Sequence, residues 1–230
     1  MIGVFQMIKF LLCAAIGYFI GCINPAYLIG KKHGVDIREK GSGNAGATNV
    51  MMLFGKFTGF FCALFDIFKA YFAIRIVKTL FPFFIQALPV TGTAVILGHL
   101  FPFYMNFRGG KGFASLTGSV LAFDIQAFFF IFIVAIVILV IGNYLCLMPV
   151  SAAILFPIVY FVLTSDIFGA IILSIVPICM CFKHKENIIR IKNGTELHFS
   201  YLWKPEEEMK RIQTNGGVDD ETVKERFLMN

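Results

Sequence analysis

Charged residues are scarce in this 230-residue sequence. They make up 15% of it, whereas about a quarter is usual for a soluble domain. Hydrophobic residues make up 58%, phenylalanine occurs 28 times, and the mean hydropathy is +0.79. So few charges cannot cover a water-exposed surface, which excludes a soluble enzyme and predicts an integral membrane protein.

Sequence motifs typical of several enzyme classes are also missing. The six cysteines form no CxxC pair and the four histidines lack HExxH spacing, so we expect neither a disulfide framework nor a metal site. There is no GxSxG nucleophile elbow. No histidine is followed five residues later by aspartate, as in the HxxxxD acyltransferases that use acyl-CoA or acyl-carrier protein. We therefore expect no cofactor and no nucleic-acid partner.

The first half of the chain contains three apolar segments. Residues 10–30 carry no charge and are long enough to cross a bilayer, although a cleaved signal peptide is the alternative. Five basic residues in 31–56 predict a cytoplasmic loop and an N-terminus outside. Further spans are expected at 57–74 and 84–103. The second contains Asp66 and Lys69, which we interpret as either a functional or a structural ion pair.

The second half of the chain must cross the membrane an even number of times if its basic tail is cytoplasmic. Residues 113–182 contain no Lys or Arg, whereas nine of the twenty basic residues follow Phe182. Four crossings satisfy this condition, and we expect them at 113–125, 127–145, 149–164 and 166–182. The predicted fold is therefore all-α and polytopic, with seven transmembrane helices, some short or tilted, an N-terminus outside and a C-terminus in the cytoplasm.

Three polar segments are expected to share the cytoplasmic face. GSGNAGATN at 41–49 can form an anion-binding nest before a helix that begins near Asn49. FRGGKG at 107–112 combines two glycines with fixed positive charge. HKENIIRIKNGTE at 184–196, if helical, presents a polar face to the membrane surface. The alternatives are a polar connecting loop for the first segment and a solvated juxtamembrane helix for the third.

These segments favour an enzyme that joins a phosphate-bearing soluble substrate to a lipid-soluble one. A transporter or flippase for a phosphorylated solute or lipid is the alternative, because its anion sites would also be rich in glycine and basic residues. His99 lies just before the FRGGKG loop, where a structural role is favoured over a catalytic one.

The ordered set of motifs, together with GHLFP, resembles the bacterial acyl-phosphate:glycerol-3-phosphate acyltransferases (PlsY) over residues 10–197. The resemblance implies transfer of an acyl group from acyl phosphate to glycerol 3-phosphate, which gives lysophosphatidic acid in the first acylation of phospholipid synthesis. It also implies seven helices, a bacterial cell-membrane location among membrane lipids, and an active site at the cytoplasmic face. We expect a monomer with no cofactor.

Candidate site residues follow from the two loops and from this resemblance. The catalytic candidates, which bind phosphate, stabilise an oxyanion or act as base, are Ser42, Asn44, Lys111, His184 and Asn187. A substrate phosphate oxygen is the alternative base to His184. The expected substrate-binding residues are Arg38, Gly41, Gly43, Gly46, Thr48, Asn49, Arg108, Gly109, Gly110, Gly112, Arg190 and Glu196.

Two positions and one segment depart from the family pattern. Met52 stands where the family commonly has an arginine, and Ala70 stands where its DxxKG motif has glycine. We expect these departures to affect substrate affinity more than reaction class. We expect an acyltransferase domain at 1–197. Residues 198–230 are expected to form a polar, loosely ordered cytosolic extension that acyl transfer does not need.

Overall fold

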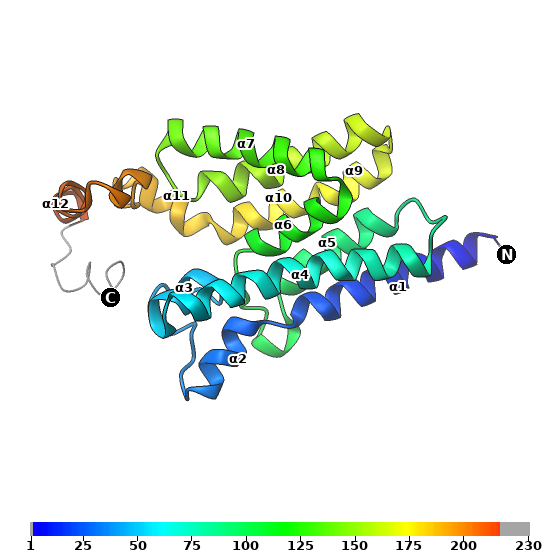
Figure 1. The fold of residues 1–230 in the computed structure, drawn as a ribbon, viewed down its shortest axis with the longest axis horizontal. Coiled ribbons are helices and arrows are strands. Elements are labelled where there is room, and N and C mark those ends of the chain that lie inside the picture. Colours follow the sequence, from blue (N-terminus) through cyan, green and yellow to red (C-terminus); the bar gives the residue numbers. More distant parts are fainter. Residues whose placement is uncertain (1, 217–230) are drawn as a thin grey trace.

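The computed structural model describes residues 2–216, and this part of the chain is helical apart from its loops and one isolated bridge between Tyr144 and His198. Most helices run along the long axis of the molecule, with the N-terminus at one end and α11 and α12 at the other (Figure 1). The elements are α1 Ile2–Cys22, α2 Pro25–Lys32, α3 Ala47–Phe54, α4 Lys56–Leu80, α5 Ala87–Leu100, η1 Phe103–Met105, α6 Phe113–Phe123, α7 Ile125–Gly142, α8 Leu147–Thr164, α9 Ile167–Leu173, α10 Ile175–Lys183, α11 Lys185–Lys192, η2 Phe199–Leu202 and α12 Pro205–Gly216.

Helix α5 is the centre of the bundle. Thirteen of its fourteen residues are buried, and it packs against α1, α4, α6, α9 and α10. Its approach to α1 is close: a Cβ on Gly98 would lie 2.2 Å from the Tyr18 carbonyl oxygen, and one on Gly21 would lie 2.1 Å from that of Val95. Small residues allow such backbone contact between apolar helices. This contact fixes the position of the α5 C-terminus, from which the FRGGKG loop follows.

The outer surface of the bundle is apolar, as expected for a membrane protein. Helix α7, for example, exposes isoleucine, valine and phenylalanine along its length. Four helical stretches among the described residues are long and apolar enough to cross a membrane, and a fifth results if the bent pair Ile167–Lys183 and Lys185–Lys192 is counted as one span. The four stretches are Gly3–Lys32, Ala87–Met105, Ile125–Gly142 and Leu147–Thr164.

The first predicted span differs from the observed helix. The helix begins at Ile2 rather than near residue 10, and it is interrupted after Cys22. Asn24 causes the restart: its side-chain oxygen accepts from the Tyr27 amide at 2.8 Å, and Pro25 occupies the first helical position, where no amide hydrogen is needed. This break directs α2 away from the axis of α1.

Residues 113–182, expected to cross the membrane four times, form helices at the four expected places, the last as α9 and α10 in succession. Of these, α7 and α8 are each long and apolar enough to cross a membrane, whereas α6 has 11 residues. Asp124 and Asp166 begin α7 and α9 as N-caps, accepting from the amides of Ala127 and Gly169 at 2.7 and 3.1 Å. The chain then bends by 52° at His184, where α10 ends and α11 begins. The bend turns α11 across the end of the bundle.

The described part of the predicted C-terminal extension, residues 198–216, contains two helical elements. This part forms η2 and α12, because Asn143 in the α7–α8 turn pairs with Phe199 and Ser200, and Arg211 of α12 pairs with the turn after α11. Residues 217–230 lie outside the described residues.

Candidate active site

The glycine loop before α3 is organised by Asn49. This fully buried side chain donates to the carbonyls of Ile37 and Lys40 at 2.8 and 3.0 Å and accepts from the Ser42 amide at 2.9 Å. A Cβ on Gly41, whose φ is +57°, would lie 2.2 Å from the Asn49 amide oxygen. The side chain of Asn49, expected to bind substrate, therefore shapes the loop instead.

Other polar side chains of this loop are free. Ser42 and Thr48 are exposed and Asn44 is half-buried, and none of these three side chains makes a hydrogen bond within the described residues. Gly43 and Gly46 belong to the same turn, and Gly46 begins α3 without a side-chain cap. The first-turn amides of α3 therefore lack intrahelical acceptors and carry the positive end of the helix dipole. This loop is suited to binding an anion.

Two arginines expected to bind substrate are held by neighbouring carboxylates. The Arg38 guanidinium pairs with Asp36 at 2.7 Å and donates to the Met105 carbonyl at 2.7 Å, and this pairing lowers the pKa of Asp36 to about 2. Arg108 pairs with Glu39 at 3.2 Å in an exposed position. Arg38 thus links the segment before the glycine loop to η1, and Arg108 links the same segment to the FRGGKG loop.

Glycines of the FRGGKG loop serve close packing. The amides of Gly109 and Gly110 donate to the carbonyls of Leu100 and His99 at 3.0 and 3.1 Å, so they are not available to a substrate. A Cβ on Gly110 would lie 2.3 Å from His99 Nε2 and 2.8 Å from the Ala45 carbonyl oxygen. The loop thus lies against the segment before α3.

Only the end of the FRGGKG loop offers free donors. The backbone amides of Lys111 and Gly112 have no acceptor within residues 2–216, and Gly112 has a φ of +87° as it begins α6. The Lys111 ammonium joins them. Burial lowers the pKa of Lys111, as does the charge of Arg190, whereas Glu196 opposes the shift.

The third segment meets Lys111 through a chain of short hydrogen bonds. Lys111 Nζ donates to Asn187 Oδ1 at 2.6 Å, and Asn187 Nδ2 donates to Glu196 Oε1 at 2.6 Å. The other Glu196 oxygen pairs with Arg190 Nε, also at 2.6 Å. Asn187 and Glu196 are buried. The segments 107–112 and 184–196 therefore form one site, in which two cations and one carboxylate leave a net positive charge.

His184 is buried beside this network with one ring nitrogen engaged. Its Nδ1 lies 2.8 Å from the Met180 carbonyl oxygen. Because a carbonyl can only accept, Nδ1 carries the proton in the neutral ring and Nε2 has its lone pair free. Burial lowers the pKa of His184, and the nearby Lys111 charge lowers it further. His184 is thus a neutral acceptor at pH 7, as a general base must be.

A second polar cluster lies inside the bundle and includes residues that the sequence left ambiguous. Lys69 Nζ lies 2.6 Å from Asp66 Oδ1 and donates to the carbonyls of Gly21 and Ile23 at 3.0 and 2.7 Å, at the break between α1 and α2. His99 Nδ1 lies 3.1 Å from Lys69 Nζ. All three side chains are buried and bonded to one another or to backbone carbonyls, which is compatible with the structural interpretation of the ion pair and of His99.

Sequence reasoning missed the part played by Asn24. Its side-chain amide is fully buried and donates to the Ala45 carbonyl at 3.1 Å, so it connects the α1–α2 break to the glycine loop. The Asn-Pro dipeptide at 24–25 is a recognisable helix-start signal inside the apolar segment 10–30 and could have indicated this.

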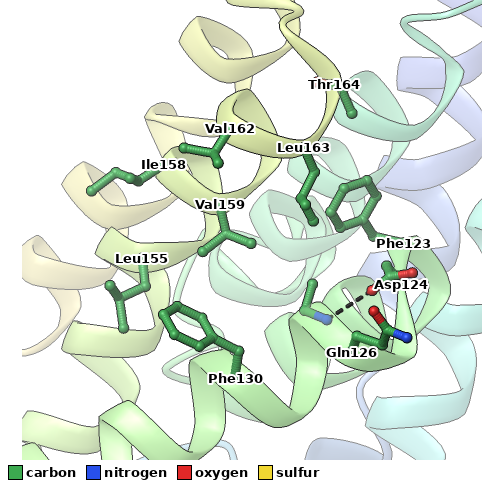
Figure 2. A pocket seen from close by; sticks show the side chains of 11 residues that line it. Phe123, Asp124, Gln126, Phe130, Leu155, Ile158, Val159, Val162, Leu163 and Thr164 are labelled. Carbon is green, nitrogen blue, oxygen red and sulfur yellow. Dashed lines mark hydrogen bonds between the residues drawn. The ribbon is translucent and has the colours of Figure 1, made fainter.

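An apolar pocket of about 740 Å³ lies between α7 and α8 (Figure 2). It is at the end where α7 begins and α8 ends, and the 18 residues of α7 span about 27 Å. The opposite end of α7 is the one that contacts the extension, through Asn143. The pocket is therefore separate from the site that contains Lys111. Its lining residues are Phe123, Asp124, Gln126, Ala127, Phe130, Leu155, Ile158, Val159, Val162, Leu163 and Thr164.

The fold and this site define a helical membrane protein with cationic side chains and free backbone amides at one end of its bundle. Comparison with known proteins identifies the class further. The family model for glycerol-3-phosphate acyltransferase matches residues 11–194, so the chain belongs to that family. This confirms the resemblance found in the sequence motifs.

Individual relatives agree with this assignment. A glycerol-3-phosphate acyltransferase of Thermosipho melanesiensis is 39% identical over 79% of this chain and 88% of its own length, and that of Aquifex aeolicus is 32% identical over 83% and 100%. Crystal structures of PlsY (YgiH), an integral membrane glycerol 3-phosphate acyltransferase, in its glycerol 3-phosphate and lysophosphatidic acid forms are 32% identical. They superpose with TM-scores of 0.75 and 0.73 over 84% of this chain and 96% of theirs.

The departures from the family pattern lie in α3 and α4. Ala70 is fully buried, and its methyl group lies against Gly118 of α6, so it takes part in helix packing. Met52 is half-buried on α3. Nothing in the structure supplies a replacement for an arginine at that position.

Proposed function

We propose that this protein transfers an acyl group from acyl phosphate to glycerol 3-phosphate, forming 1-acyl-glycerol 3-phosphate and inorganic phosphate. The observation that carries the proposal is the Lys111–Asn187–Glu196–Arg190 network beside the free Nε2 of His184. It places cationic donors and a neutral base together at the end of a membrane bundle. Membership of the glycerol-3-phosphate acyltransferase family supports the same acceptor and product.

The reaction needs positioning and proton transfer rather than a covalent enzyme intermediate. His184 Nε2 accepts the proton of a glycerol 3-phosphate hydroxyl as the hydroxyl oxygen bonds to the acyl carbon. The bond between that carbon and the phosphate oxygen then breaks, and phosphate leaves with the electron pair. Because phosphate is a good leaving group, no nucleophilic side chain is required. A phosphate oxygen of the substrate is the competing base.

The two loops bind different parts of the substrates in this proposal. The open side chains of Ser42, Asn44 and Thr48 and the amides that begin α3 hold glycerol 3-phosphate. Lys111 and the free amides at 111–112 hold the acyl phosphate group and stabilise the developing oxyanion, with Asn187 orienting the ammonium. Arg38, Arg108 and Asn49 support the loop, and Gly109 and Gly110 permit its packing.

The proposal includes a topology. Seven spans place the N-terminus outside and all three polar segments on the cytoplasmic side of a bacterial cell membrane. The acyltransferase site lies within residues 1–197, and one chain supplies every residue of it, so the active form is a monomer. Residues 198–230 are a cytosolic addition.

Direct assay of the purified protein tests the reaction. Acyl phosphate and labelled glycerol 3-phosphate should give labelled 1-acyl-glycerol 3-phosphate, whereas acyl-CoA in place of acyl phosphate should give none. The His184→Gln variant is the control for contaminating activity. Product formed equally well from acyl-CoA would contradict the proposed donor, and no product from either donor would contradict the function.

Cysteine labelling tests the topology. In a background without the six native cysteines, single cysteines at Lys40, Arg108 and Asn193 should react with a membrane-impermeant maleimide only from the cytoplasmic side. Labelling of the Asn193 position from outside would show an odd number of crossings between 113 and 182 and would remove that segment from the shared site.

A further inference from the structure

The segment 198–216 lies beyond the family match at residues 11–194, yet it is bound at two points, the α7–α8 turn and the turn that contains Glu196 of the site. At the first, the Asn143 side chain accepts from the Ser200 amide at 2.9 Å, and the Asn143 carbonyl accepts from the Phe199 amide at 2.7 Å. This contact holds η2 against the turn between α7 and α8. The second contact is made by α12.

Arg211 of α12 binds the turn that contains Glu196. Its Nη1 donates to the Gly194 carbonyl at 2.5 Å and its Nη2 donates to the Glu196 carbonyl at 2.6 Å. Asn215 Nδ2 also donates to the Gly194 carbonyl, at 3.1 Å. Gly194 has a φ of +67°, so the turn is tight, and two of its carbonyls are held by one planar guanidinium.

Arg211 is itself held in place by Glu208. This buried carboxylate accepts from Arg211 Nη2 at 2.9 Å and from His198 Nδ1 at 2.7 Å. Burial alone would raise the pKa of Glu208, but the two hydrogen bonds lower it overall, so the carboxylate is charged at neutral pH. The Glu208 carboxylate therefore restrains the orientation of the Arg211 guanidinium.

Hydrogen bonds on the backbone and on the side chain of Glu196 connect Arg211 with the Lys111 ammonium. The backbone of Glu196 is held by Arg211, and its carboxylate orients Asn187 and Arg190. Asn187 in turn accepts from Lys111. Arg211 is the one member of this set of residues that lies outside the family motifs, which end at Glu196.

We propose that Arg211 is a positioning residue for acyl transfer: by fixing the carbonyls of Gly194 and Glu196, it sets the Glu196 carboxylate against Asn187 and thereby aims Lys111. The proposal rests on the proposed function and reverses the expectation that the chain beyond Leu197 is dispensable. A displacement of about 1 Å at a reacting group can cost about 100-fold in rate, so loss of Arg211 should lower kcat/KM for acyl phosphate by about 10- to 100-fold.

The test compares Arg211→Ala with Lys210→Ala, which removes the same charge from the next residue of α12. The Lys210 side chain is exposed and makes no bond within the described residues, so this variant should behave as wild type. Arg211→Ala should raise KM for acyl phosphate and lower kcat in a protein that still unfolds cooperatively in detergent, although loss of the pair with Glu208 lowers its melting temperature. Arg211→Lys should restore only part of the loss, because an ammonium cannot match the planar fork of a guanidinium.

A double-mutant cycle separates positioning from a general stabilising role. If Arg211 acts through Glu196, adding Arg211→Ala to Glu196→Gln should lower kcat/KM by less than twofold further. A chain that ends at Gly216 should keep wild-type activity, and one that ends at Leu197 should match Arg211→Ala. Additive losses in the cycle, or full activity in Arg211→Ala, would overturn the inference while the proposed function stood. An inactive wild-type protein would overturn both.

Discussion

The two glycine-rich segments differ in what their glycines do. In 41–49, glycines with positive φ shape a loop whose Ser42, Asn44 and Thr48 side chains are open to substrate. In 107–112, Gly109 and Gly110 have their amides bonded to backbone carbonyls and leave no room for a Cβ. Similar composition therefore leaves polar side chains unbonded in one segment and serves close backbone packing in the other, where the Lys111 side chain bonds to Asn187.

The largest expected effect on kcat/KM is that of a substitution at His184, in the segment 184–196. His184→Gln removes the proposed base and should lower kcat/KM by about 10²- to 10⁴-fold, the usual range for general base catalysis. In the wild type, burial and Lys111 lower the pKa of His184, so the ring stays neutral until the pH falls below the ordinary value near 6.5. Activity should be level above pH 7 and should fall in acid as His184 becomes protonated.

The pH profile of kcat/KM checks this prediction. Because the phosphate of glycerol 3-phosphate also titrates near pH 6, its binding should be measured over the same range as a control. If the His184→Gln variant retains the acid limb of the wild-type profile, the substrate phosphate is the base and His184 is not.

The next largest effect compares a glycine of each loop. A Cβ on Gly110 would overlap His99 Nε2 and the Ala45 carbonyl, so Gly110→Ala should displace Lys111 and lower kcat/KM by about 100-fold, with about 1–3 kcal/mol of lost stability. At Gly43 the nearest atom, the Arg38 carbonyl oxygen, would lie 3.4 Å from a Cβ. Gly43→Ala should therefore add only the strain of its positive φ, about 1–2 kcal/mol.

Thermal unfolding in detergent and steady-state kinetics measure these two variants side by side. Equal tolerance of alanine at positions 110 and 43 would show that the FRGGKG loop does not depend on close packing.

A smaller effect is expected within the first loop. Asn49→Ala removes three hydrogen bonds that hold the loop, each contributing about 0.5–1.5 kcal/mol, so it should lower the free energy of unfolding by roughly 1.5–4.5 kcal/mol. Thr48→Ala removes an exposed, unbonded side chain and should change the free energy of unfolding by no more than about 0.5 kcal/mol. Denaturation midpoints for the pair would reveal whether Asn49 shapes the loop, since equal midpoints exclude it.

The sequence predicted those features that depend on local signals. Hydropathy located the long apolar helices, whereas the N-cap roles of Asp124 and Asp166 came only from the structure. The motif order also grouped Lys111 with Asn187, and in the structure Lys111 Nζ lies 2.6 Å from Asn187 Oδ1. These features could be predicted because each depends on composition, spacing or family resemblance.

Features that depend on tertiary partners could not be predicted in the same way. The sequence does not reveal that Asp36 and Met105 occupy the Arg38 guanidinium, or that carbonyls of α5 take the amides of Gly109 and Gly110. Arg211 lies in a polar segment without a motif, and its partners are carbonyls whose position depends on the fold of the preceding turn.

Kinetics of Ser42→Ala and Lys111→Ala, with each substrate varied in turn, test the division between the two loops most directly. Lys111→Ala should lower kcat/KM for acyl phosphate by roughly 10- to 150-fold, equivalent to a charge-assisted hydrogen bond of about 1.5–3 kcal/mol. Ser42→Ala should act mainly on kcat/KM for glycerol 3-phosphate. If both variants keep wild-type kcat/KM for both substrates, these segments are connectors and the site assignment is wrong.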